Sequence, residues 1–403
     1  MKIAYVSNYL NHHTEALCKH LYQRLDGNFV FIETEKNPSE ESDNNREFKM
    51  GYAYYFAGQI DRKSIPWCLK AYSDEDSRKT ALDIINSSDA VIIANASDDW
   101  IMKRLKAGGL TFRAHERWYK KGLKVVRFPR AVAGGWLHHG RFNSLYLLSA
   151  SAYTAADAAK VGCFRDKAYR WGYFPDFEDY TETQIVQMKS GELPTVLWAG
   201  RFVDWKHAEA AIEACSKLLE EGYQFELRLA GTGPEDKNLR QLCENCGILG
   251  NAEFLGKLTP EQVRGEMEAA DIFLLTSNFQ EGWGVVLNEA MNSACAVVAS
   301  HAAGATPYLL KNGENGLIYK SEDLDELQKC VRYLLKNPEK RLEMGLNAYK
   351  SIKTAWTPDI AAERLIHLCQ QINTGKESEY KDGPCSKAPI VANEWWRENE
   401  FVR

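Results

Sequence analysis

The stretch IFLLTSNFQEGWGVVLNEAM, residues 272–291, contains a short apolar run, a loop with two glycines and the start of a helical pattern. An uninterrupted apolar run of this length is typical of a strand that is covered on both faces, as in a parallel sheet. The loop carries Glu281 and the helical part carries Glu289. We therefore predict a strand, a loop and a helix, with the loop at the carboxyl end of a parallel strand.

The same alternation of apolar runs and amphipathic helical segments occurs in two series along the chain. Two such series predict an α/β protein with two doubly wound, Rossmann-like domains that face each other across a cleft. A ligand is expected in that cleft, outside the carboxyl ends of the strands. The first series is 3–7, 29–34, 90–95, 110–115 and 145–149, and the second is 195–200, 225–231, 252–256, 272–277, 296–300 and 316–319.

The domain boundaries follow from a polar segment between the two series, residues 176–194, which ends in Pro194. We read this segment as a linker without a strand pattern. We expect an N-terminal, acceptor-binding domain over 1–185 and a C-terminal, donor-binding domain over 186–356. Residues 357–403 are expected to form a helix and a tail that pack back on the N-terminal domain.

Composition and charge exclude several classes of protein. The chain has 50 basic and 55 acidic residues, a net charge of -5, which argues against a general nucleic-acid binder. Its ten cysteines show no framework spacing and are expected to be reduced thiols of a cytoplasmic protein. The N-terminal apolar run is too short for a signal peptide, and no apolar run reaches the roughly 18 residues of a membrane span.

Two patterns that resemble metal sites have simpler interpretations. Cys243 and Cys246 have C-x-x-C spacing, but no second pair and no nearby histidines accompany them, so we expect thiols without a metal. Asp74, Glu75 and Asp76 have D-x-D spacing, but they stand directly ahead of a helical segment. Acids at that position commonly cap a helix, which is the role that we predict for them.

The chemistry around the opening stretch suits a nucleoside diphosphate. A helix that begins near Gly284 would present backbone amides to a phosphate, and the carboxylate of Glu289 suits the two vicinal hydroxyls of a ribose. Arg201 and Lys206 follow the first strand of the second series, and two cations at such a turn suit a diphosphate. A solvated pair of cations and a surface glutamate are the ordinary alternatives.

Four segments together resemble the donor half of the retaining glycosyltransferases of family 4, which have the two-domain GT-B fold. These are GRFVDWK (200–206), LRLAGTGP (227–234), FLGKL (254–258) and EGWGVVLNEAM (281–291). The resemblance implies that Arg201 and Lys206 hold the donor diphosphate, the backbone around Lys257 reads the base and Glu289 binds the ribose. It also implies that the transferred sugar is held by Glu281 and by the backbone of Gly282, Trp283, Gly284 and Val285.

The first half of the chain resembles the family less closely. Family members often have a glycine-rich loop after the first strand, whereas this chain has SNYLNHHTE, in which Asn11, His12 and His13 offer hydrogen-bond donors instead. The resemblance assigns a catalytic role to His115, at the end of a predicted strand, together with Glu281. A structural role is the alternative for a histidine at a strand end.

The segment 101–130 has ten Lys or Arg residues and a single acid, Glu116, with aromatic residues between them. A solvated face is the ordinary interpretation of such a charge run. The aromatic residues also make it suitable for an anionic membrane surface or a pyrophosphate-linked lipid acceptor. We expect the protein to be cytoplasmic and, if it contacts a membrane, to lie at its inner face.

These observations give the hypothesis of a metal-independent, retaining hexosyltransferase. It would move a sugar from a nucleoside diphosphate sugar, UDP- or GDP-linked, to a glycan or lipid-linked acceptor, with no cofactor and no nucleic acid. One alternative is a sugar-nucleotide epimerase of the GT-B type. The other is a non-enzymatic module that binds a nucleotide sugar or a membrane.

Overall fold

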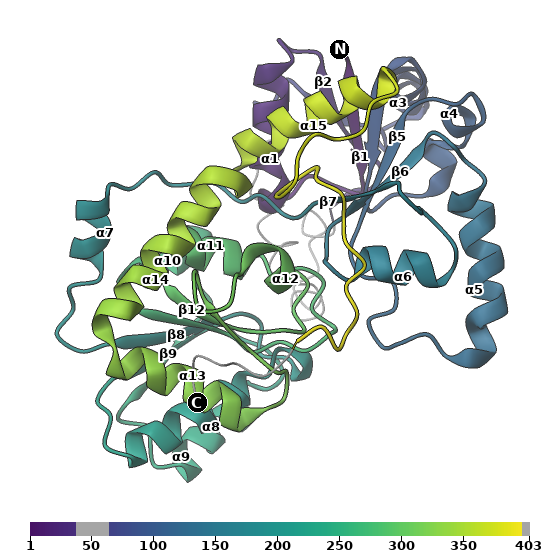
Figure 1. Cartoon of the computed structure of the whole chain (residues 1–403). Helices are drawn as coiled ribbons and strands as arrows, with labels where there is room; N and C mark the ends of the chain where they lie inside the picture. The colour runs from purple at the N-terminus through teal and green to yellow at the C-terminus, as the bar shows by residue number, and fades with distance from the viewer. Residues whose placement is uncertain (38–63, 397–403) are drawn as a thin grey trace. The chain divides into compact units, whose positions relative to one another are not determined.

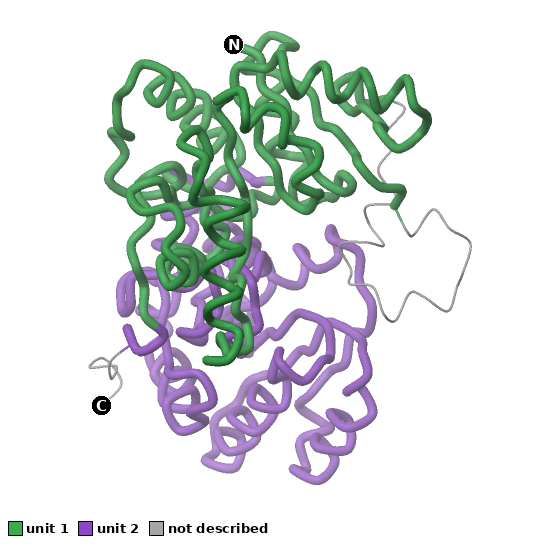
Figure 2. The backbone as a smooth tube through the Cα atoms, turned by 90° about the vertical axis from the view of Figure 1, so that its right-hand side faces the viewer, with its two compact units in different colours: residues 1–176, 355–392 green, residues 177–354, 393–403 purple. Residues whose placement is uncertain are grey.

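The computed structural model describes residues 1–37 and 64–396, and the chain divides into two compact units. Unit 1 comprises residues 1–176 and 355–392, and unit 2 comprises residues 177–354 and 393–403 (Figure 2). Each unit contains one parallel sheet with helices packed around it (Figure 1). The prediction of two doubly wound α/β domains is confirmed.

Unit 1 has a seven-stranded sheet in the order β3-β2-β1-β4-β5-β6-β7, in which all neighbouring strands are parallel. Five strands lie where their apolar runs predict them. The two edge strands, β3 and β7, were not predicted, because three residues are too few to give a pattern. The strands are β1 (Ile3–Ser7), β2 (Phe29–Glu33), β3 (Cys68–Lys70), β4 (Ala90–Ile93), β5 (Thr111–His115), β6 (Leu145–Ser149) and β7 (Ala168–Arg170).

Several helices of unit 1 begin at a side-chain cap. The oxygen of Asp74 accepts a hydrogen bond from the Ser77 amide at 2.6 Å, which confirms the capping role predicted for this acidic segment. The helices are α1 (His12–Arg24), α3 (Glu75–Ser87), α4 (Met102–Lys106), α5 (Phe128–Gly135), α6 (Thr154–Lys160) and α15 (Pro358–Asn373), with the short turns η2 (Asp98–Trp100), η3 (Val125–Arg127) and η4 (Trp136–Gly140).

Residues 355–392 of the C-terminal segment belong to unit 1. Helix α15 lies beside α1, and the Arg24 guanidinium contacts the Asp359 carboxylate at 2.7 Å (Figure 1). Beyond α15 the chain runs along β7, where the Cys385 amide donates to the Arg170 carbonyl at 2.9 Å. This segment therefore covers one face of α1 and the exposed edge of the sheet.

Unit 2 has a six-stranded parallel sheet in the order β10-β9-β8-β11-β12-β13. All six strands lie at the predicted positions. The side chains of β8, β11, β12 and β13 are buried on both faces, as their continuous apolar runs require, whereas the edge strand β10 is partly exposed. The strands are β8 (Thr195–Ala199), β9 (Glu226–Ala230), β10 (Ala252–Gly256), β11 (Ile272–Leu275), β12 (Ala296–Ser300) and β13 (Leu317–Tyr319).

The polar segment that we read as a linker contains a helix of unit 2, α7. Thr181 and Gln184 form a capping box at its start, a signal that the sequence carries and that we had not used. The helices are α7 (Glu182–Met188), α8 (Ala208–Glu220), α9 (Asp236–Asn245), α10 (Pro260–Ala269), α11 (Val286–Asn292), α12 (Thr306–Leu309), α13 (Leu324–Lys336) and α14 (Pro338–Ser351), with the turns η5 (Asp204–Lys206) and η6 (Ile352–Trp356).

Within the part of the chain that the structure describes, no helix is both long enough and apolar enough to cross a membrane.

Candidate functional site

The candidate donor site of unit 2 lies where the order of its strands changes direction. Strands β8 and β11 are neighbours in the sheet, although they are far apart in the sequence. In sheets of this kind, ligands bind outside the carboxyl ends of the strands at such a point. The loops that follow these strands are residues 200–207 and 276–285. They carry Arg201, Lys206 and Glu281.

Hydrogen bonds join these two loops. The Trp198 indole donates to the Thr276 hydroxyl at 2.8 Å, and that hydroxyl donates to the Lys206 carbonyl at 2.7 Å. The Asn278 amide donates to the Trp205 carbonyl at 3.0 Å. Because buried hydrogen bonds hold the backbone of both loops, the positions of the side chains that they carry are defined.

His207 makes a further contact between the loops, and the sequence reading did not identify it. Its Nε2 atom lies 3.0 Å from the side-chain nitrogen of Asn278, and its Nδ1 atom lies 2.6 Å from a Glu209 carboxylate oxygen. The hydrogen bond to Glu209 raises the pKa of His207. Asn278 lies three residues after the end of β11, in a run of polar residues at the carboxyl end of a strand. This position was the signal in the sequence that could have identified the contact.

Lys206 and Glu281 form an ion pair across the two loops. The Lys206 Nζ atom lies 2.6 Å from the Glu281 Oε2 atom, and the Ser277 hydroxyl donates to the same oxygen at 3.0 Å. Both side chains are largely buried, with 13% and 14% of their surface exposed. Separating the two groups would leave two poorly solvated charges, which is unfavourable. The ion pair therefore holds both side chains in place.

Arg201 has a different environment. Its guanidinium carbon lies 5.5 Å from the centre of the Trp205 ring, a cation–π contact. Within residues 1–37 and 64–396, Arg201 forms no ion pair with a carboxylate. Its charge is therefore not neutralised in the described structure, which suits an anionic ligand.

A close approach of two loops holds the backbone around Arg201. The Phe202 amide donates to the Thr232 carbonyl at 3.0 Å. A Cβ atom on Gly233 would lie 2.3 Å from the Phe202 carbonyl oxygen, far inside van der Waals contact, so only glycine fits there. The segment that contains Gly233 thus supports the loop that carries Arg201.

The loop 282–285 differs in part from the prediction. Helix α11 begins at Val286, two residues after the expected start at Gly284, because Gly284 has a φ of 90° that a helix does not accept. The Trp283 side chain is buried, and its indole donates to the Asn288 side chain at 2.8 Å. The side chain of Trp283 is therefore part of the core, and a ligand role remains only for its backbone.

Glu289 lies in α11, and its surroundings perturb its ionisation. Burial raises the pKa of its carboxyl to about 7, and the positive charges of Arg264 and Lys206 act in the opposite direction.

Lys257 is exposed and follows β10, where the Gly231 amide donates to the Gly256 carbonyl at 2.9 Å. Lys257 and Glu289 both belong to unit 2.

His115, the candidate of unit 1, is the last residue of β5. Its Nδ1 atom lies 2.7 Å from the Glu116 carbonyl oxygen, which can only accept, so Nδ1 carries the proton and Nε2 has the free electron pair. Burial lowers the pKa of His115. The ring is therefore neutral near pH 7 and can accept a hydrogen bond or a proton.

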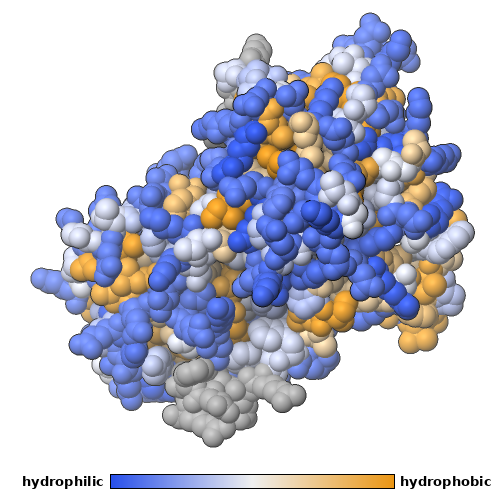
Figure 3. All heavy atoms as spheres, turned by 45° about the horizontal axis from the view of Figure 1, so that its top comes forward, coloured by the Kyte–Doolittle hydropathy of each residue, from blue (hydrophilic) through white to orange (hydrophobic). Residues whose placement is uncertain are grey.

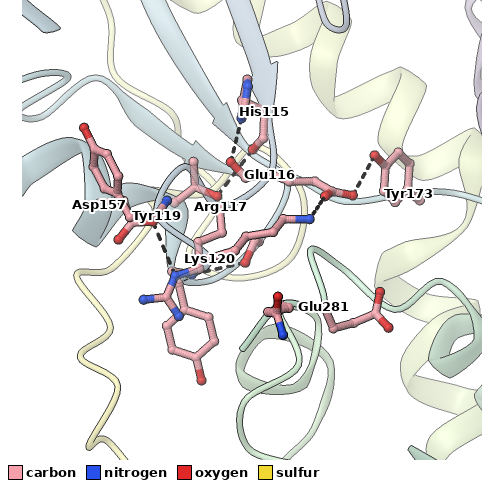
Figure 4. A network of polar contacts seen from close by, with 12 residues as sticks. His115, Glu116, Arg117, Tyr119, Lys120, Asp157, Tyr173 and Glu281 are labelled. Atoms are coloured by element: carbon pink, nitrogen blue, oxygen red, sulfur yellow. Dashed lines mark hydrogen bonds and ion pairs between the residues drawn. The ribbon is translucent and has the colours of Figure 1, made fainter. Parts of the chain in front are cut away.

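A polar network extends from His115 along the same loop (Figure 4). The Glu116 carboxylate lies 2.8 Å from the Lys120 ammonium and accepts a hydrogen bond from the Tyr173 hydroxyl at 3.0 Å. The Tyr173 ring lies 6.1 Å from that of His13, at the start of α1. Sequence reading missed Glu116 and Tyr173, since neither belongs to a recognisable motif.

Asn11 and the two histidines after it form the beginning of α1. The Asn11 side-chain oxygen accepts a hydrogen bond from the His13 amide at 3.1 Å, so Asn11 caps the helix. The rings of His12 and His13 lie 3.7 Å apart. The structure therefore gives the side-chain oxygen of Asn11 a capping role, and donation by its side-chain nitrogen stays a prediction.

The basic segment 101–130 is only partly a surface, which corrects the expectation of a single charged face. Arg104, Arg113 and Arg117 are buried, with 3–6% of each residue exposed. The Arg104 guanidinium donates to several main-chain carbonyls, including that of Ser88 at 2.7 Å. Arg113 forms an ion pair with Asp98, and Arg117 lies 3.4 Å from Asp157. These three cations stabilise the fold and cannot face a membrane.

The cysteines that resembled a metal motif also have structural surroundings. Cys243 is fully buried in the core of unit 2, and Cys246 packs against that core. Among the described residues, no group of three or more His, Cys, Asp or Glu side chains is arranged to hold a metal ion.

Solved structures share this fold. The Anabaena protein HepE, crystallised with UDP, superposes with a TM-score of 0.66 at 16% identity and covers 93% of this chain and 99% of its own. A glycosyltransferase from Rickettsia africae superposes with a TM-score of 0.69 at 13% identity over the same shares of the two chains. At these identities the likeness establishes the fold.

Sequence comparisons match part of the chain. A relative from Corynebacterium glutamicum, a GDP-mannose-dependent monoacylated alpha-(1-6)-phosphatidylinositol monomannoside mannosyltransferase, is 27% identical over 199 residues. The match spans 48% of this chain and 51% of the relative, so the chain is matched over about half of that protein's length. The family model described as glycosyl transferases group 1 matches residues 180–351, which lie within unit 2 and include Arg201, Lys206, Glu281 and Glu289.

Proposed function

We propose that this protein is a glycosyltransferase that moves a sugar from a nucleoside diphosphate sugar to a glycan or lipid-linked acceptor, with retention of the anomeric configuration. The observation that carries the proposal is the pairing of Lys206 and Glu281 beside Arg201, on two joined loops at the switch point of unit 2. The family match over residues 180–351 supports it. We assign the protein to the cytoplasm.

Departure of the diphosphate is the difficult step, because negative charge develops on the leaving oxygens. Arg201 and Lys206 would stabilise that charge, and preorganised groups of this kind each contribute about 2.7–4 kcal/mol. The backbone amides of residues 282–285 would add donors. These groups would take the place of a divalent ion, and we propose a metal-independent reaction.

Glu281 would orient the transferred sugar and stabilise positive charge on its ring. Its carboxylate already has an ammonium and a hydroxyl within 3.0 Å, and these two contacts hold the side chain in one position. Lys206 would lie between the carboxylate and the leaving group. In this proposal Lys206 stabilises the negative charge on the leaving diphosphate, and Glu281 stabilises the positive charge on the sugar ring.

The remaining site residues would bind the rest of the substrates. Glu289 would accept hydrogen bonds from the ribose hydroxyls, and the backbone near Lys257 would contact the base. His115, with its free Nε2 atom, would act on the acceptor side in unit 1. The donor nucleotide is UDP- or GDP-linked, an assignment supported by UDP in the Anabaena neighbour and by GDP-mannose in the name of the relative.

The test of this proposal compares donor binding with turnover. Because the interaction of the cations with the diphosphate strengthens as its charge develops, Arg201→Ala and Lys206→Ala should each lower kcat by about 100-fold or more and weaken donor binding much less. EDTA should leave wild-type activity unchanged. The matched control is Lys217→Ala, an exposed lysine on α8 of the same unit, which should behave as wild type.

Turnover in the absence of any acceptor would indicate an epimerase instead. Full transfer rates in the Arg201→Ala, Lys206→Ala double variant, or activity that EDTA abolishes and manganese restores, would contradict the assignment of the diphosphate site.

A further inference from the structure

An exposed apolar surface lies on η3, α5 and η4 of unit 1. Among the described residues, eleven large hydrophobic side chains are exposed, and six of them fall within residues 125–137. Val125 is 87% exposed and Trp136 is 59% exposed. Figure 3 shows orange atoms among blue ones on the right-hand side, where Figure 1 places α5. The six residues are Val125, Val126, Phe128, Val132, Trp136 and Leu137.

Ala131 of α5 packs against the core of unit 1, but none of the six exposed apolar side chains belongs to that core. Gly135 is the one buried residue of α5, and a Cβ atom there would lie 2.7 Å from the Cys163 sulfur, so the helix touches the unit at this end. A helix normally buries its apolar face against its own domain. An apolar group that the domain itself does not cover marks a surface for another molecule.

The charge of the segment identifies that molecule. Lys121, Lys124, Arg127 and Arg130 are exposed beside the apolar side chains. The sequence has no Asp or Glu between Glu116 and Asp157. Apolar and aromatic side chains bordered by Lys and Arg are typical of helices that lie in the interface of an anionic bilayer.

We propose that residues 121–137 bind the surface of an anionic lipid bilayer. The six apolar side chains would enter the boundary between head groups and acyl chains, and the four cations would lie among the lipid phosphates. This contact lies further toward the C-terminus than the basic segment 101–130 suggested, because Arg104, Arg113 and Arg117 of that segment are buried in unit 1.

A second copy of this chain is the other natural occupant of an apolar surface. A two-fold contact would bring the same patch of both copies together. Each copy would then place its four cations against those of the other, and the segment offers no carboxylate to compensate them. An anionic bilayer supplies the compensating charge, which a second copy does not.

The surface is connected to the candidate acceptor residue, so the inference extends to the acceptor and there rests on the proposed function. His139, in η4, stacks on Trp118 at a ring distance of 5.2 Å, and Trp118 meets the His115 ring edge-on at 6.1 Å. His138 is held by Asp98 at 3.0 Å. Docking of residues 121–137 would thus bring His115 near the head groups, which favours a lipid-linked acceptor.

Co-sedimentation of the full chain with vesicles tests the surface. We expect binding to vesicles of phosphatidylcholine mixed with phosphatidylglycerol, weakening as salt rises, and little binding to phosphatidylcholine alone. Trp136→Ser with Leu137→Ser should weaken binding at least tenfold. Lys124→Glu, Arg127→Glu, Arg130→Glu should weaken it about a hundredfold or more, since each cation near an anionic surface contributes about a factor of five.

The matched control reverses the charge of three exposed lysines outside this surface, with the substitutions Lys237→Glu, Lys329→Glu and Lys381→Glu. This variant should bind vesicles as the wild type does. The proposal would be overturned if phosphatidylglycerol did not increase the binding of the wild-type protein to vesicles. It would also be overturned if the control variant bound vesicles as weakly as the test variant. A wild-type dimer in analytical ultracentrifugation that Trp136→Ser, Leu137→Ser dissociates would assign the surface to self-association instead. Calorimetric binding of UDP or GDP by the surface variants reports on the donor site separately, so the two proposals fail independently.

Discussion

At the scale of single residues, the candidate donor site depends on charges whose partners are specific. Lys206 is held against Glu281, whereas Arg201 lies over an aromatic ring. The sequence placed both cations in the site, because they follow a strand. It did not indicate that Lys206 faces a carboxylate, since the partner comes from a loop about 75 residues away, at Glu281, and such contacts depend on the fold.

Burial is the other property that a charge pattern does not reveal. Arg104, Arg113 and Arg117 resemble the exposed cations around them in sequence, yet their guanidinium groups lie inside unit 1. Conversely, Trp283 lies in the loop with the strongest family resemblance, yet its side chain belongs to the core. Residue type and spacing thus indicate candidate loops, and the packing of the fold determines which of their side chains face outward.

The raised pKa of Glu289 gives a prediction about donor binding. In the free protein this carboxyl titrates at about 7, and hydrogen bonds from the ribose would favour its ionised form and lower its pKa in the complex. Donor binding should therefore release a proton near pH 6. The affinity should rise up to tenfold per pH unit as pH increases toward about 7 and then level off.

Calorimetric titration in two buffers of different ionisation enthalpy measures this proton release. Glu289→Gln should bind donor more weakly, without the proton release, and with little dependence on pH in this range. The variant also separates the contribution of Glu289 from that of His207, whose pKa is raised by its hydrogen bond to Glu209. Wild-type affinity that stays constant from about pH 5 to about pH 8, a range that includes the pKa of about 7, would show that Glu289 does not contact the ribose.

At the scale of elements, the strands of unit 2 were predictable and the contacts between its loops were not. Strands β8, β11, β12 and β13 are buried on both faces and so require continuous apolar runs. The loop after β8 is instead held by the loop after β9, through the Phe202 amide and the Thr232 carbonyl. Nothing in the composition of either loop indicates that they touch. The glycines of the G-T-G-P segment, Gly231 and Gly233, are the trace of this contact in the sequence, because a Cβ atom on either would overlap the loop after β8.

That contact predicts the effect of Gly233→Ala. A methyl group 2.3 Å from the Phe202 carbonyl oxygen must displace the backbone of one loop. We expect a loss of stability of about 1–3 kcal/mol or more, as for other overpacked sites, and weaker donor binding because Arg201 moves with its loop. Denaturant unfolding and calorimetric titration with donor measure the two effects.

Gly265→Ala is the matched control, since a Cβ atom on this glycine of α10 meets nothing within 4 Å. Alanine in a helix interior should raise stability by about 0.5–1 kcal/mol and leave donor binding unchanged. Equal stability of Gly233→Ala and wild type would mean that the loops separate at little cost.

At the scale of the whole molecule, unit 1 is built from two distant parts of the chain. Its sheet comes from the first 176 residues, but α15 and the segment along β7 come from the C-terminal end. The sequence identifies α15 as a helix by its pattern, and only the structure shows that it lies against α1. Unit 2 has its sheet and helices α7–α14 in one continuous segment, 177–354. The two units should therefore respond differently to a C-terminal truncation.

A chain that ends at Thr354 should lose the fold of unit 1 and keep that of unit 2. Leu365, Leu368 and Cys369 of α15 are fully buried in unit 1. Burying each leucine contributes about 1.5–3 kcal/mol, and whole domains are stable by only about 5–15 kcal/mol. Removing α15 also exposes its apolar partners on α1. Unit 2 loses contacts such as that of Trp395 with His301, 6.3 Å apart, but none of its strands.

Differential scanning calorimetry with and without UDP or GDP decides this prediction. The truncated chain should show one transition, which the nucleotide shifts upward because it binds only the folded unit 2. The control is Arg24→Ala in the full chain, which breaks the exposed ion pairs of α1 with Asp359 and Glu363 and should cost less than about 1 kcal/mol. If the truncated chain loses nucleotide binding, unit 2 depends on unit 1 for its fold. If it keeps two transitions, α15 is dispensable, because the remaining core of unit 1 is then sufficient without it.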